Sequence, residues 1–171
     1  MPSKGRWEAA WQDRPQEEAS VFNPAFCGEL IFRAMRGYYQ MRKRPFNFGL
    51  SFLVLPIVLH KPTRDILPGN ASAAFTAWSA ERSGLLVGLP DRISRLVPIT
   101  RESLSFLMQN SAVQVAQGGL VAGPKPIAIS AKLEWTTKDA DDARHAAALL
   151  GRWFANQGPA SVIMQGFGVT P

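Results

Sequence analysis

The chain has 171 residues, of which 46% are hydrophobic, so it can bury one core and is too apolar to be disordered throughout. Its single cysteine, Cys27, excludes an intramolecular disulfide and fits a reducing compartment. The longest apolar run, residues 48–59, is interrupted by Pro56 and is shorter than the roughly 20 residues of a membrane helix. Residues 1–20 lack the apolar stretch of a secretory signal, so we expect a soluble, cytoplasmic protein without a membrane partner.

The net charge of +6 is unevenly distributed along the chain. Residues 33–101 hold eleven basic and three acidic residues, a balance of +8, whereas residues 102–171 hold five of each sign. A concentrated basic surface favours an acidic partner, which is either nucleic acid or an acidic protein face. The alternative is a charge that only keeps the protein soluble.

The first half of the chain reads as a lead followed by helices. Residues 1–20 are polar and are expected to form a flexible lead, in which Trp7 and Trp11 have a helical spacing that can dock it on the body or on a partner. Asn23-Pro24 predicts the start of an amphipathic helix that ends near residues 42–45. Residues 46–60 form a buried segment whose length favours helix, and residues 61–69 read as a loop between prolines.

Further short helices are predicted up to residue 112. Asn70 is a candidate N-cap for a helix through residues 78–82. An apolar helix over residues 85–97 is expected to end at Pro98, and Thr100 is expected to cap the next helix, over residues 100–112.

The second half predicts a hairpin, a helix and a strand. Alternating residues around 113–115 and 127–129 indicate a β-hairpin with a long tip over residues 113–130. Thr136 or Thr137 caps a helix that ends at residues 158–159, and a short strand is expected at residues 161–165. The fold class is therefore α+β: a mainly helical single domain over residues 21–171, with about six helices, a hairpin and a short C-terminal strand. Residues 85–130 have the element order of a winged-helix unit. The side chains expected in the core are Phe26, Leu30, Leu53, Leu55, Leu104, Leu107, Leu150 and Phe154.

The sequence contains no recognisable catalytic motif. It has no phosphate-binding loop, and Cys27, His60 and His145 are too scattered to hold zinc together. No carboxylate stands two residues before a lysine, as in many nucleases, and no Gly-x-Ser-x-Gly elbow supports a serine nucleophile. We therefore predict no catalytic residue, metal or cofactor.

Three residues have both a functional and a structural interpretation. His60 is either a general base or ligand, or a buried histidine hydrogen-bonded to backbone, and the structural interpretation is favoured. Arg64 can bind a carboxylate or phosphate in a bidentate manner, or pair locally with Asp65. Gly151 interrupts a helix and indicates a close approach, for which a tight helix–sheet contact inside the protein is favoured.

Three stretches together resemble a known family. Residues 23–26, residues 52–64 with 67–68, and residues 149–155 are similar, in order and spacing, to the middle component of bacterial three-component ABC systems, which overlap with Lamassu-type antiphage defence. The resemblance extends over residues 21–171. It implies two partners: an ATPase like those of chromosome-maintenance and Rad50 proteins, and an effector subunit that is often a nuclease. It implies no functional residue.

We therefore expect a non-catalytic bridging subunit that docks on the ATPase and holds the effector. The alternatives are a stand-alone winged-helix DNA-binding regulator and an enzyme with an unrecognised site. DNA is a possible partner, directly or through the complex, but an acidic protein face is favoured because the charges lie beside long apolar stretches. The candidate partner-binding residues are Trp7, Trp11, Arg33, Arg36, Lys43, Lys61, Arg64, Arg92, Arg95 and Arg101.

Overall fold

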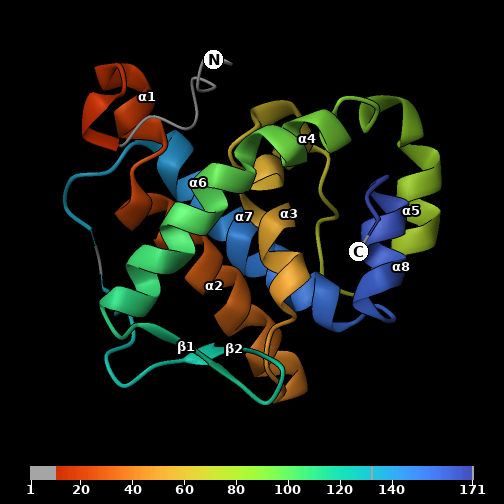
Figure 1. The fold of residues 1–171 in the computed structure, drawn as a ribbon. Coiled ribbons are helices and arrows are strands. Elements are labelled where there is room, and N and C mark those ends of the chain that lie inside the picture. The colour runs from red at the N-terminus through yellow and green to blue at the C-terminus, as the bar shows by residue number, and fades with distance from the viewer. Residues whose placement is uncertain (1–10, 132, 171) are drawn as a thin grey trace, which may run out of the picture.

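The computed structural model describes residues 11–131 and 133–170, and Figure 1 shows a helical body with one hairpin at its lower edge. The main helices are α2 (Pro24–Arg42), α3 (Ser51–Val58), α6 (Leu89–Gln109) and α7 (Lys138–Ala155). The shorter elements are η2 (Trp11–Asp13), α1 (Gln16–Val21), η3 (Phe48–Leu50), α4 (Lys61–Asp65), α5 (Phe75–Glu81), η4 (Ser83–Leu85) and α8 (Ala160–Gly166). The hairpin consists of β1 (Val113–Ala116) and β2 (Gly119–Ala122). A mainly helical α+β domain is confirmed.

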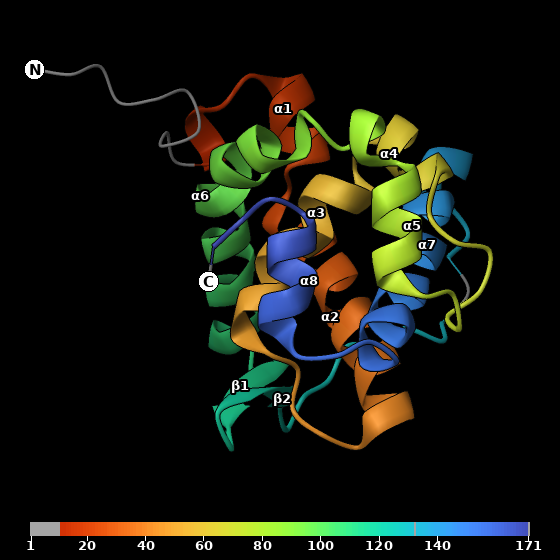
Figure 2. The same cartoon turned by 90° about the vertical axis from the view of Figure 1, so that its right-hand side faces the viewer.

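Helix α2 is the centre of the fold and packs on α3, α6 and α7, as the turned view in Figure 2 also shows. It begins as predicted, because the side chain of Asn23 accepts a hydrogen bond from the backbone N–H of Ala25, at 2.8 Å, and Pro24 occupies the first turn. Along the α2–α7 interface, Glu29 contacts Arg144 and Ala34 lies against Gly151, so the two helices run in the same direction. The close approach at Gly151 is therefore between two helices, and the predicted helix–sheet contact is wrong.

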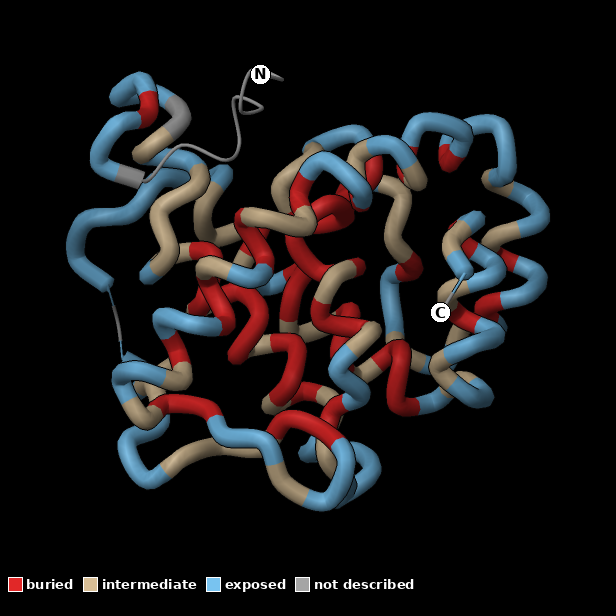
Figure 3. The backbone as a smooth tube through the Cα atoms, in the orientation of Figure 1, coloured by how far each residue is buried: buried red, intermediate tan, exposed pale blue. Residues whose placement is uncertain are grey.

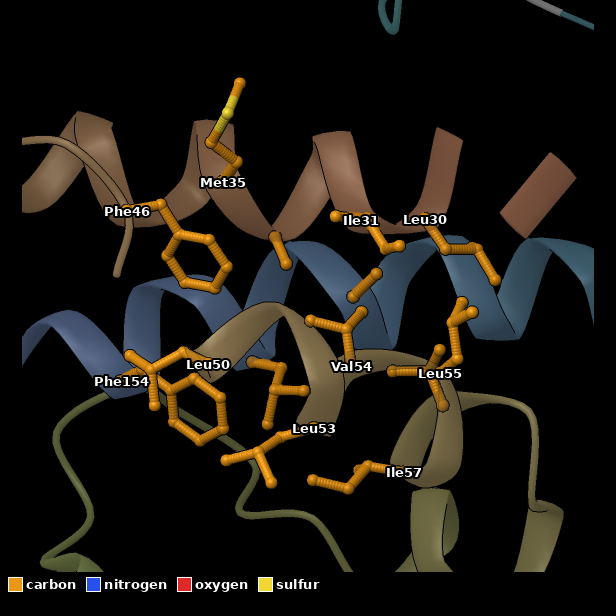
Figure 4. Close-up of a cluster of buried hydrophobic side chains, with 14 of the residues drawn as sticks. Leu30, Ile31, Met35, Phe46, Leu50, Leu53, Val54, Leu55, Ile57 and Phe154 are labelled. Carbon is orange, nitrogen blue, oxygen red and sulfur yellow. The ribbon is translucent and has the colours of Figure 1, made fainter. Parts of the chain in front are cut away.

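Helix α3 fills the space beside α2 and α7. Five of its side chains, from Leu53 to Val58 without Pro56, are fully buried. Figure 4 shows four of them, Leu53, Val54, Leu55 and Ile57, below the two helices. Buried backbone follows the same central region in Figure 3. The predicted core is confirmed for seven of its eight side chains, whereas Phe26 is only partly buried and packs against the core from the end of α2.

The hairpin is shorter than expected. Gln117 and Gly118 both have positive φ, of 52° and 79°, and form a two-residue turn between β1 and β2. The second alternating stretch, residues 127–129, is not a strand; Ile127 and Ile129 pack partly against the core instead. Phe46 exchanges backbone hydrogen bonds with Leu120 and so attaches the hairpin to the end of α2.

The predicted helix break at Pro98 is wrong, because α6 continues through it. Pro98 cannot donate to the carbonyl of Ser94. Ser94 lies on the exposed side of α6, where water can satisfy that carbonyl, so the missing hydrogen bond costs little. With one continuous helix over residues 89–109, the described residues contain no helix–turn–helix in the proposed winged-helix unit.

The predicted C-terminal strand is also wrong, because residues 160–166 form helix α8. The segment has only four apolar residues, which are compatible with a helix or with a strand. Contacts with neighbouring elements decide between the two. As a helix, α8 buries Ile163 and places Phe167 against Phe75 of α5, with ring centroids 5.1 Å apart. The helical conformation therefore places these side chains in the aromatic cluster between α5, α7 and α8, which a strand would not do.

Two smaller expectations are corrected. Residues 61–65 form a helix rather than a loop, and Asn70 does not cap α5, whose N-cap is Ala74. The side chain of Asn70 instead accepts a hydrogen bond from Ser72.

The N-terminal part of the described chain contains η2 and α1. Its Arg14 forms an ion pair with Glu102 of α6, at 2.7 Å.

Candidate partner-binding surfaces

The described residues offer no site for metal or thiol chemistry. Among them, no group of three or more His, Cys, Asp or Glu side chains is placed to hold a metal ion. Burial raises the pKa of the Cys27 thiol to about 12, so at neutral pH this side chain is protonated and is a poor nucleophile. In the same part of the chain, no helix combines the length and apolar character that crossing a membrane requires.

His60 is a structural residue at the start of α4. Its Nδ1 lies 2.8 Å from the Thr63 hydroxyl and accepts a hydrogen bond from the Thr63 backbone N–H, so the imidazole is the N-cap. Arg92 approaches the other ring nitrogen at 3.4 Å. Burial, and then the positive charge of Arg92, lower the pKa of His60 below its usual 6.5.

We expect His60 to make the stability of the fold dependent on pH. Because its pKa is lower in the folded chain, the unfolded chain binds the proton first as the pH falls below about 6.5. The contribution is complete above that pH and is lost as the pH falls towards the folded pKa. In urea unfolding from about pH 7 to pH 5, the wild type should therefore lose more stability than His60→Asn, which keeps a capping oxygen and does not titrate. Parallel curves would show that His60 makes no such contribution.

Arg64 is buried, and its side chain is bound within the protein. Its side chain donates to the carbonyl of Val58, at 2.7 Å, and forms an ion pair with Asp139 in the first turn of α7. The predicted local pair with Asp65 is wrong, since Asp65 pairs with Lys61 at 2.5 Å. Arg64 therefore joins α3, α4 and α7 and is not available to a partner.

Arg33 and Arg92 are also occupied within the fold. Arg33 donates to Glu29 and to the carbonyl of Ile129, at 2.8 and 3.1 Å. Glu29 also accepts from Arg144 of α7, so one carboxylate pairs with two arginines at the α2–α7 interface. Arg92 donates to Thr63 and to the carbonyl of Pro56. At least three of the eleven basic residues counted between residues 33 and 101 thus have structural partners.

The remaining candidate cations that the structure describes lie at the surface, in three places. Arg95 and Arg101 are exposed on the outer side of α6, and Lys61 is in a surface ion pair. Arg36 and Lys43 line a groove of about 550 Å³ between the second half of α2 and the hairpin. We call this the basic groove. Trp7 and the side chain of Trp11 lie outside what the structure describes.

A second groove, which the sequence did not predict, lies at the other end of α2. It has a volume of about 600 Å³, and its apolar lining includes Val21, Phe26, Leu59 and Ala143. Trp135, which precedes the N-cap of α7, is 95% exposed on its rim. We call this the Trp135 groove. The one feature of the sequence that could have indicated this groove is Trp135 itself, a tryptophan in a polar segment that does not belong to the apolar face of a predicted helix.

The comparison with protein families matches residues 11–171 to middle component 3 of ABC-three-component systems. The chain belongs to this family. No curated protein and no solved structure matches it. The family resemblance predicted from three stretches is confirmed at the level of the middle component of a three-component ABC system. The match does not specify the Lamassu type, the kind of ATPase or the effector.

Proposed function

We propose that this middle component is a non-catalytic bridging subunit of an antiphage complex of the Lamassu type. It docks on an ABC ATPase like those of chromosome-maintenance and Rad50 proteins, and it links that ATPase to an effector subunit such as a nuclease. The family membership supports a place in a three-component system.

The Trp135 groove is the observation that carries this proposal. A tryptophan exposed by 95% has a large apolar surface in water, which is unfavourable unless a partner covers it. Tryptophan is also among the residues that contribute most to binding at protein interfaces. Val21, which lines the same groove, is 49% exposed, so the apolar surface is larger than one side chain.

The rim of the groove is held by the body of the protein. Arg144 donates to Glu29 and to the Thr136 hydroxyl, next to Trp135, at 2.8 and 2.7 Å. Its guanidinium also lies over the ring of Phe26, 5.2 Å from the centroid. A rim fixed in this way loses little conformational entropy on binding, which suits a docking site.

The test is co-purification with the ATPase of the same three-component system. Trp135→Ala should weaken capture roughly 30-fold or more, because hot-spot truncations cost at least about 2 kcal/mol. The matched control is Val87→Ala, which truncates a side chain that is 78% exposed near the start of α6. Equal capture of Trp135→Ala and the wild type would refute the docking role of the groove.

A further inference from the structure

We infer that the basic groove binds an extended, Asp- and Glu-rich segment of a second partner protein. This inference rests on the proposed bridging function, because it supplies the second of the two contacts that a bridge needs. It concerns a different surface from the Trp135 groove.

The geometry of the basic groove suits a chain segment. One wall is the second half of α2, with Met35, Arg36 and Tyr39, and the other is the hairpin, with Gln114 and Val121. Its volume of about 550 Å³ is in the range of sites that enclose a ligand of several residues or a small molecule.

The charge of the groove favours an acidic occupant. Its lining contains Arg36 and Lys43 and no acidic side chain. Unlike Arg33, Arg36 has no ion pair within the described residues, and Lys43 lies over the ring of Tyr39, 5.6 Å from its centroid. Two cations held without counter-charges in a concave surface attract carboxylates and steer them to the site.

The backbone of β1 favours a polypeptide over a nucleic acid. Leu120 directs its N–H and C=O towards Phe46, away from β1, so its partner Val115 directs its own N–H and C=O away from β2. Val115 stands between Gln114 and Ala116, which both line the groove. Val115 itself does not line the groove, so the free edge of β1 borders it, and an extended peptide that follows the groove can add backbone hydrogen bonds to that edge. Two cations are few for DNA, which proteins bind through many phosphate contacts.

The two grooves lie at opposite ends of α2. Phe26 lines the Trp135 groove and Tyr39 lines the basic groove. At a rise of about 1.5 Å per residue, the two positions are roughly 20 Å apart along the helix. One partner can therefore occupy each groove at the same time, and the rigid α2–α7 pair fixes their separation.

The experiment measures fluorescence anisotropy of a short, labelled peptide of alternating Asp and Glu, titrated with the whole chain. We expect binding by the wild type, and at least tenfold weaker binding by Arg36→Glu/Lys43→Glu, since reversal places like charges in contact. The matched control is Arg95→Glu/Arg101→Glu, which changes the net charge equally on the outer side of α6. It should bind the peptide like the wild type.

Three results would overturn the inference: no binding by the wild type, equal losses in the groove and control variants, or tighter binding of duplex or single-stranded DNA than of the peptide through Arg36 and Lys43. A peptide of alternating Asn and Gln should bind weakly, which separates charge from backbone pairing. Trp135→Ala should bind the acidic peptide normally. A failure of the Trp135 test with intact peptide binding would thus reject the docking proposal alone, and the reverse result would reject this inference alone.

Discussion

Replacing Gly151 with alanine is expected to destabilise the protein by roughly 1–3 kcal/mol or more, as overpacking of a tight core does. An added Cβ would lie 1.9 Å from the backbone carbonyl oxygen of Ala34, a contact that only a shift of α7 away from α2 can relieve. Alanine would gain about 0.5–1 kcal/mol as a better helix former. The clash is with backbone rather than with a flexible side chain, so we expect the loss to exceed this gain.

The measurement is the free energy of unfolding in urea, with Gly84→Ala as the control. Gly84 lies in η4, and a Cβ there would have no atom within 4 Å. The control should therefore be close to the wild type. Equal stability of Gly151→Ala and Gly84→Ala would show that the α2–α7 contact can relax without cost.

The sequence predicted correctly where helices α2 and α7 begin, because N-caps depend on residues that are close together in the chain. Asn23-Pro24 specified the start of α2, and Thr137, one of the two residues expected to cap α7, accepts a hydrogen bond from Ala140 at 3.2 Å. These caps depend on residues within one turn of the chain. The apolar spacing of α2 and α7 likewise identified Leu30, Leu150 and Phe154 as core residues, because burial follows the helical period.

The errors arose where distant contacts decide the structure. Whether Pro98 ends a helix depends on where the carbonyl of Ser94 points, and this follows from the packing of α6 on α2 and α3. Residues 161–164 are too few to show a period, and the aromatic cluster with Phe75 makes them helical. Neither contact can be read from neighbouring residues.

The candidate site shows the same limit. A count of charges identified a basic block, but it could not separate Arg33 and Arg64 from Arg36. Arg33 pairs with Glu29 within α2 and Arg64 pairs with Asp139 of α7, whereas Arg36 lines a groove. Partners more than 70 residues away, such as Asp139 for Arg64, are determined by the tertiary fold. The exposure of Trp135 also depends on the tertiary fold, so a tryptophan in the sequence does not reveal whether it is core or interface.

The two tryptophans of the C-terminal half allow a direct test of this distinction. Trp153→Ala is expected to destabilise the protein by about 3–5 kcal/mol, the usual cost of removing a large aromatic side chain from a core. The ring is fully buried against Phe75 and Trp78, with centroids 5.5 and 4.8 Å away, and its indole N–H donates to the carbonyl of Ala73 at 2.7 Å. Trp153→Phe should cost less, because the side chain of Gln157 also donates to that carbonyl.

Trp135→Ala is the matched control, with the same change at a side chain that is 95% exposed. Its free energy of unfolding should stay within about 0.5 kcal/mol of the wild type, as for most surface substitutions. A large loss of stability in Trp135→Ala would mean that the ring packs on the body in the free protein, and weaker capture of the ATPase would then report unfolding. An unchanged stability, together with weaker capture, would instead assign the effect to the surface that Trp135 presents to its partner.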